Sequence, residues 1–141
     1  MGIKTTDLTP FQGPSALNPA PKSVFTKVFQ VARTDTTASV KCVLPAGSSI
    51  IDFDFYGPAS NAGTTAVLNI GSSSGTITDY INGQNVRVAG KQKPDASFSI
   101  NLPNIENQPT TADLPIYAQY AETGGASSSG GPWKVLVWYI L

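Results

Sequence analysis

The stretch "PWKVLVWYIL", residues 132–141, decides the fold class. Successive side chains of an extended strand point to opposite sides. One side of this stretch carries Trp133, Val135, Val137 and Tyr139. The other side carries Lys134, Leu136, Trp138 and Ile140. Both sides are largely apolar, yet the run is far shorter than the ~20 residues of a membrane-spanning helix. We therefore expect a β-strand that is covered on both sides.

The second side of this strand has two possible covers. A loop or the N-terminal segment of the same chain can lie over it, or Leu136, Trp138 and Ile140 can meet another subunit. Trp and Tyr are enriched at such contacts, so Trp133 and Tyr139 are also candidate interface residues. Both covers are present at once if the N-terminal segment comes from a neighbouring copy.

Period-two alternation continues upstream and indicates half-buried strands. The stretches that show it are "TASVKCVL" at 37–44, "IIDFDFY" at 50–56, "TAVLNI" at 65–70, "SFSINL" at 97–102 and "IYAQYA" at 116–121. Their expected core sides are Ala38, Val40, Cys42 and Leu44; Ile51, Phe53 and Phe55; Ala66, Leu68 and Ile70; and Phe98, Ile100 and Leu102. The stretch "VFTKVFQVA", 24–32, fits a helix or a strand, and its β-branched and aromatic residues favour a strand.

Turn-forming clusters separate these stretches. Within "DYINGQNVRV", 79–88, Asn82-Gly83 predicts a hairpin with a type I′ turn, because both residues tolerate positive φ. We expect eight or nine short strands and no helix. The spacing predicts an all-β fold, a jelly-roll-like β-sandwich.

Residues 1–22 are predicted to form an extended, Pro-rich N-terminal arm, and residues 23–141 the β-sandwich domain. Proline at positions 10, 14, 19 and 21 disfavours both helix and strand ladder. Leu8, Phe11 and Leu17 are the scattered apolar residues by which the arm would dock on a partner.

Composition excludes several classes of function. The 141 residues contain nine basic and nine acidic side chains and no histidine, so the net charge is zero and only 13% of residues are charged. We expect neither nucleic acid nor a membrane as a partner. Cys42 is the single cysteine, so zinc sites and Cys–His or Ser–His catalytic arrangements lack their usual residues. We predict no cofactor, no metal and no enzymatic activity.

Asp52 and Asp54 are the most tempting catalytic pair. Two carboxylates on one strand side occur in glycosidases and calcium sites. The alternative is the polar side of a half-buried strand, which we favour because calcium needs more oxygen ligands than this pair offers.

A basic cluster and two tyrosines are further candidate binding residues. Arg87, Lys91 and Lys93 form the one basic cluster, which we interpret as a solvated loop; the alternative is contact with an acidic partner. Tyr117 and Tyr120 point to opposite sides of their strand, so at least one ring could be exposed for stacking on a sugar or a protein.

The combination of "LPAGSSIIDFDFYGPASNAGTTAVLNIGSSSG" (44–75), "YINGQNVRVAG" (80–90) and "LPIYAQY…GGPWKVLVWYI" (114–140) resembles capsid cement or decoration proteins of tailed phages. The resemblance covers roughly residues 43–141 and leaves out the arm. It implies a β-sandwich that binds the outside of an assembled capsid, with the major capsid protein and its own copies, as a homodimer or homotrimer, for partners. It also implies a virion protein made in the bacterial host cytoplasm. The alternative is a carbohydrate- or receptor-binding module of a phage tail or fibre.

Overall fold

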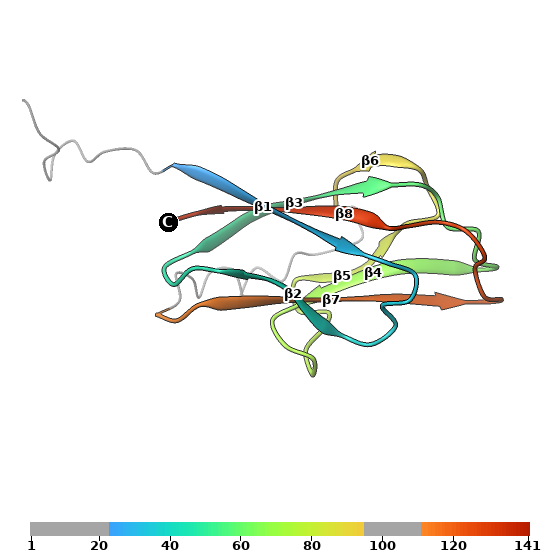
Figure 1. The fold of residues 1–141 in the computed structure, drawn as a ribbon, viewed down its shortest axis with the longest axis horizontal. Coiled ribbons are helices and arrows are strands. Elements are labelled where there is room, and N and C mark those ends of the chain that lie inside the picture. The colour runs from blue at the N-terminus through green and yellow to red at the C-terminus, as the bar shows by residue number, and fades with distance from the viewer. Residues whose placement is uncertain (1–22, 95–110) are drawn as a thin grey trace, which may run out of the picture.

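The computed structural model describes residues 23–94 and 111–141, and all regular secondary structure in these ranges is β (Figure 1). The eight strands are β1 (Val24–Val31), β2 (Ser39–Leu44), β3 (Ser49–Gly57), β4 (Thr65–Gly71), β5 (Ile81–Asn85), β6 (Gly90–Gln92), β7 (Leu114–Thr123) and β8 (Trp133–Ile140). The ambiguous segment at the start of the domain is thus a strand, as favoured. No helix in the described ranges is long and apolar enough to cross a membrane.

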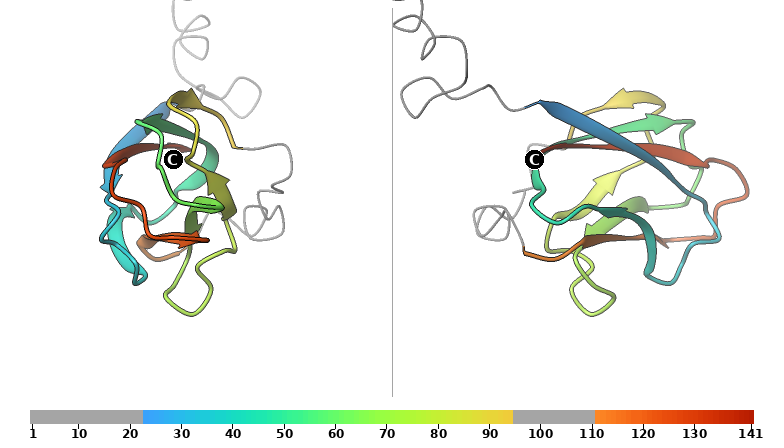
Figure 2. Two further views of the ribbon diagram at one scale, coloured as in Figure 1. Left: turned by 90° about the vertical axis from the view of Figure 1, so that its right-hand side faces the viewer. Right: turned by 60° about the vertical axis from the view of Figure 1, so that its left-hand side comes forward.

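The strands form two four-stranded antiparallel sheets, in the orders β1-β8-β3-β6 and β2-β7-β4-β5. The sheets face each other as two layers (Figure 2). Strand β1 pairs with β8, β2 with β7, β3 with β6 and β4 with β5. The first strand thus pairs with the last, the second with the second-last, and so on inward. This is the pairing pattern of a jelly roll, in which one long hairpin is folded over into two sheets. The predicted jelly-roll-like sandwich is confirmed.

The hydrophobic core lies between the sheets. The inward side of β8 supplies Trp133, Val135, Val137 and Tyr139, all buried. The Trp133 ring stacks on Tyr120 of β7 with 5.1 Å between centroids, and its indole N–H donates to the Pro58 carbonyl at 2.8 Å. The core side predicted for the strand at 65–70 is also confirmed, since Ala66, Leu68 and Ile70 of β4 are buried.

Two β-bulges correct the predicted core sides. In β3 the register shifts between Ile50 and Asp52, so Ile50 is buried and Ile51 is 46% exposed. In β2 it shifts between Val40 and Cys42, which leaves Val40 outside the core. Strict alternation failed at Ile51 and Val40 because a bulge adds one residue to a strand and reverses the sides beyond it.

The predicted Asn82-Gly83 hairpin turn is wrong. Both residues lie inside β5, where Ile81 pairs with Ile70 and Gln84 with Leu68. They stand opposite a single residue of β4, and Gly83 has a φ of 81°. The sequence correctly indicated a positive φ at this site, but the positive φ of Gly83 belongs to a bulge within β5 and not to a hairpin turn.

Some predictions fall outside the described residues. They are the N-terminal arm with Leu8, Phe11 and Leu17, and the stretch with Phe98, Ile100 and Leu102.

The bulge predicts a specific cost for a side chain at Gly83. We expect Gly83→Ala to lower the free energy of unfolding by about 1–2 kcal/mol, because a β-carbon is strained at this φ. Urea denaturation measures the change. The control is Gly75→Ala, because Gly75 has no positive φ and its methyl group would meet nothing nearer than Ser73 Oγ at 4.0 Å. Equal stability of the two variants would contradict the bulge.

Candidate functional site

The outer side of the sheet β1-β8-β3-β6 carries the candidate site. The strand registers place Val24 beside Ile140, and Val28 beside Leu136. Trp138 lies between Thr26 of β1 and Asp52 of β3. The β1 and β8 part of this side is therefore mostly apolar, whereas the β3 part carries two carboxylates.

We call the apolar part the outer strip. It consists of Val24, Val28, Ile51, Leu136, Trp138 and Ile140. Val24 and Val28 are 54% and 56% exposed, while Leu136, Trp138 and Ile140 are half-buried. Single exposed apolar residues are ordinary on a protein surface, whereas a large contiguous group is typical of an interaction site.

The predicted interface residues separate into three groups. Leu136, Trp138 and Ile140 lie on the outer strip. Trp133 and Tyr139 face the core, with 1% and 6% of their surface exposed. The arm residues are not described. Sequence reasoning missed Val24 and Val28, although "VFTKVFQV" carries apolar residues on both sides, as residues 132–141 do.

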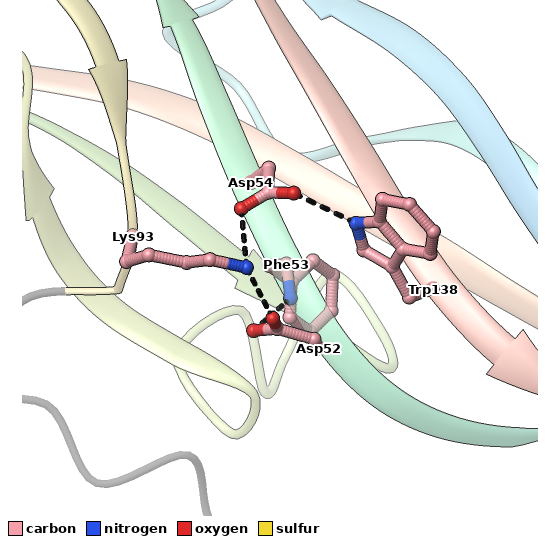
Figure 3. A network of polar contacts seen from close by, with 5 residues as sticks. All are labelled: Asp52, Phe53, Asp54, Lys93 and Trp138. Carbon is pink, nitrogen blue, oxygen red and sulfur yellow. Dashed lines mark hydrogen bonds and ion pairs between the residues drawn. The ribbon is translucent and has the colours of Figure 1, made fainter.

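Trp138 also belongs to a polar network that borders the outer strip (Figure 3). Its indole N–H donates to Asp54 Oδ2 at 2.8 Å. The Lys93 ammonium lies 2.6 Å from Asp54 Oδ1 and also contacts Asp52 Oδ2. The Phe53 backbone N–H donates to Asp52 Oδ1 at 2.8 Å. Lys93, just beyond β6, thus joins two residues of β3, and Asp54 joins β3 to β8.

The network keeps Asp54 ionised although only 2% of the residue is exposed. Burial pushes the pKa of Asp54 upward, but hydrogen bonds from Lys93 and Trp138 outweigh it, so this pKa lies below the usual 3.8. The hydrogen bonds to Asp52 and Asp54 raise the pKa of Lys93.

The buried carboxylate, Asp54, does not have the properties of a glycosidase acid. Such an acid needs a raised pKa to stay protonated, and the pKa of Asp54 is lowered. Within the described ranges no group of three or more His, Cys, Asp or Glu could hold a metal ion. Both aspartates lie on the outward side of β3, as we favoured. However, Asp54 is buried beneath its partners, which the sequence did not indicate.

The basic cluster does not act as one group. Lys93 pairs with the carboxylates, the Lys91 ammonium lies 5.8 Å from the centroid of the Tyr56 ring, and Arg87 donates to the Thr64 carbonyl at 2.6 Å. Each of the three cations therefore has a partner of its own.

The two tyrosines have different environments. Tyr120 is buried and its hydroxyl donates to Glu122 Oε2 at 2.6 Å, so its ring cannot stack on a sugar. Tyr117 is half-buried on the outer side of the other sheet.

The fold has a counterpart among phage capsid structures. A chain of the capsid asymmetric unit of cyanophage Pam1 matches with a TM-score of 0.60 at 18% sequence identity, covering 93% of this chain and 95% of that chain. A chain of the acid-stable capsid of Helicobacter pylori bacteriophage KHP30 has a TM-score of 0.40 at 10% identity, covering 86% and 94%. No family model and no curated protein matches the sequence. The Pam1 likeness establishes a shared fold.

The network predicts a pH-dependent effect of Lys93→Met. Without the ammonium, burial dominates and the pKa of Asp54 rises. We expect the free energy of unfolding at neutral pH to fall by about 1–2 kcal/mol, a value reduced because Lys93 is half-exposed. In the wild type, the stabilisation of the folded state by ionised Asp54 is fully present above the usual pKa of this residue. It is lost as the pH falls through the lowered pKa. The deficit of the variant should therefore shrink as the pH falls through the raised pKa of its own Asp54, and vanish below the lowered wild-type pKa, which lies under 3.8.

Thermal or urea unfolding across this pH range measures the deficit. Lys134→Met is the matched control, since it removes the same charge from an exposed position of β8. A deficit that stayed constant with pH would show that Asp54 does not depend on Lys93.

Proposed function

We propose that this protein is a structural protein of a bacteriophage virion that binds the outside of the capsid and bridges neighbouring capsomers. Its partners are the major capsid protein and further copies of itself. It is made in the host cytoplasm and acts without cofactor or catalysis.

The observation that carries this proposal is the fold likeness to a chain of a phage capsid asymmetric unit over 93% of the present chain. Jelly rolls serve many functions, so the likeness alone does not identify a role. The sequence motifs that resemble capsid cement proteins support the same role independently.

The outer strip supplies the attachment surface. It is apolar, and on the β3 side it is bordered by Asp52, Asp54 and Lys93, whose charges are already paired with one another. A partner can therefore cover the strip without stripping water from an unpaired charge. The N-terminal arm, through Leu8, Phe11 and Leu17, extends the contact to an adjacent capsomer.

Bridging stabilises the shell by linkage. A ligand that binds only the assembled shell lowers the free energy of that state by an amount that grows with its concentration and affinity. Each bound copy that contacts two capsomers thus opposes their separation, and no chemical step is needed.

The test is addition of purified protein to empty shells of the major capsid protein of the same virus. We expect binding and a higher temperature of shell disruption. Ile51→Asp should weaken binding at least about tenfold, because it places a carboxylate in the apolar contact. Val88→Asp is the matched control, since Val88 lies outside the strip and is 57% exposed, against 46% for Ile51.

Two results would count against the proposal. Wild-type protein that did not bind shells but copurified with tails would indicate a tail or fibre module. Equal binding by the Ile51 and Val88 variants would remove the outer strip from the contact.

The arm predicts a separate effect. Replacing Leu8, Phe11 and Leu17 together with Ser should weaken shell attachment while leaving the thermal unfolding of the isolated protein unchanged, because these residues precede the sandwich. Ser15, Thr5 and Thr9 changed together to Ala provide the control. Cosedimentation with shells measures attachment, and undiminished attachment of the triple Ser variant would exclude a docking arm.

A further inference from the structure

Strand β1 is an unusual edge strand. It lies at the end of the sheet β1-β8-β3-β6, and none of the described strands pairs with its outer edge. All eight of its residues pair with β8 in one unbroken register, without a bulge. The strand contains no proline, and residues 23–28 and 30 are exposed. A long, regular, apolar edge is a template for pairing with another chain.

The other three edge strands of the two sheets have features that hinder pairing with another chain. Strand β6 has three residues. Strand β2 is interrupted by its bulge at Lys41, and β5 by its bulge at Gly83. Short edges and bulges are the devices by which proteins prevent edge-to-edge association. Strand β1 is neither short nor interrupted by a bulge.

The only charged residue of β1, Lys27, does not prevent the edge from pairing with another chain. The Lys27 ammonium donates to the Val43 carbonyl of β2 at 2.5 Å. β1 and β2 lie at the same margin of the sandwich (Figure 2). The ammonium of Lys27 is thus bonded to the other sheet.

We propose that β1 pairs antiparallel with β1 of a second copy, around a two-fold axis at Thr26. The axis is perpendicular to the sheet, so outward side chains of one copy oppose outward side chains of the other. Val24 of one copy then faces Val28 of the other, and Thr26 faces Thr26. Apolar pairs and Thr–Thr pairs are favourable across antiparallel strands.

The residues of β1 select this register. An axis at Lys27 would set two ammonium groups opposite each other, which is unfavourable. An axis at Val28 would leave Val24 beyond the paired segment. An axis at Thr26 pairs Val24 with Val28, which are 54% and 56% exposed, and brings Phe25, 40% exposed, opposite Lys27.

Pairing at β1 joins the two four-stranded sheets into one continuous sheet. The outer strips of both copies then meet at the two-fold axis and form a single larger apolar surface. This pairing depends only on the edge of β1. A monomeric protein that still binds shells would overturn the pairing and leave shell attachment in place.

A charge-swap experiment on the full chain tests the pairing. Sedimentation velocity of the wild type should give twice the 14.7 kDa of one chain. Thr26→Lys alone and Thr26→Glu alone should each weaken dimerisation on the order of a hundredfold, because like charges meet at the axis. An equimolar mixture of the two variants should restore a dimer containing one chain of each. Ser39→Lys on the bulged edge of β2 is the control and should remain dimeric.

The outcomes are distinct. Dissociation of each single variant and recovery in the mixture support the pairing. A wild type that is monomeric at all micromolar concentrations, or trimeric, would overturn it. Dimers that persist in Thr26→Lys would also overturn it, because the contact would then lie elsewhere. Circular dichroism of each variant confirms that loss of the dimer is not loss of the fold.

Discussion

Strand β8 is the constraint on which the rest of the structure depends. It lies between β1 and β3, and pairs with both. Its inward side supplies Trp133, Val135 and Val137 to the core. A shift of one residue would move this whole set to the outside, so the core fixes the register of β8 and, through the ladder, that of its two neighbours. The apolar outer strip is the other consequence, because Leu136, Trp138 and Ile140 must then point outward.

The network of Asp52, Asp54 and Lys93 gives the outer side a boundary. Asp54 lies against Leu136 in the ladder and accepts the indole N–H of Trp138. The side chain of Trp138 is therefore held in place at the margin between apolar and charged surface. A rigid aromatic side chain loses little conformational entropy on binding, which makes it suited to a contact surface. The charges beside it are paired before any partner arrives.

Much of the fold followed from alternation, and the errors have one cause. The strand at 65–70 and the two-sided strand at 133–140 were predicted with the correct core sides, because each is regular through its length. Ile51, Val40 and the Asn82-Gly83 turn were assigned incorrectly because each lies at a bulge. A bulge depends on what the neighbouring strand can pair with, and that is not encoded within a window of a few residues. For the candidate site, the pattern correctly placed Leu136, Trp138 and Ile140 on one side of β8, whereas Trp133 and Tyr139, also predicted at an interface, face the core. Val24 and Val28 were missed because only the register with β8 brings them alongside.

The sequence by itself determined that the chain is all-β, that its last strand has two apolar sides, and that it contains no histidine and a single cysteine. These are properties of composition and of local period, which need no knowledge of distant residues. Only the tertiary structure decided which strands stand at the edges, that Asp54 is buried and paired with Lys93, and that β1 alone among the edges of the described sheets is long and unbroken. Edges, bulges and buried ion pairs arise from contacts between residues far apart in the chain, because strand order is set by how the two sheets close over a common core.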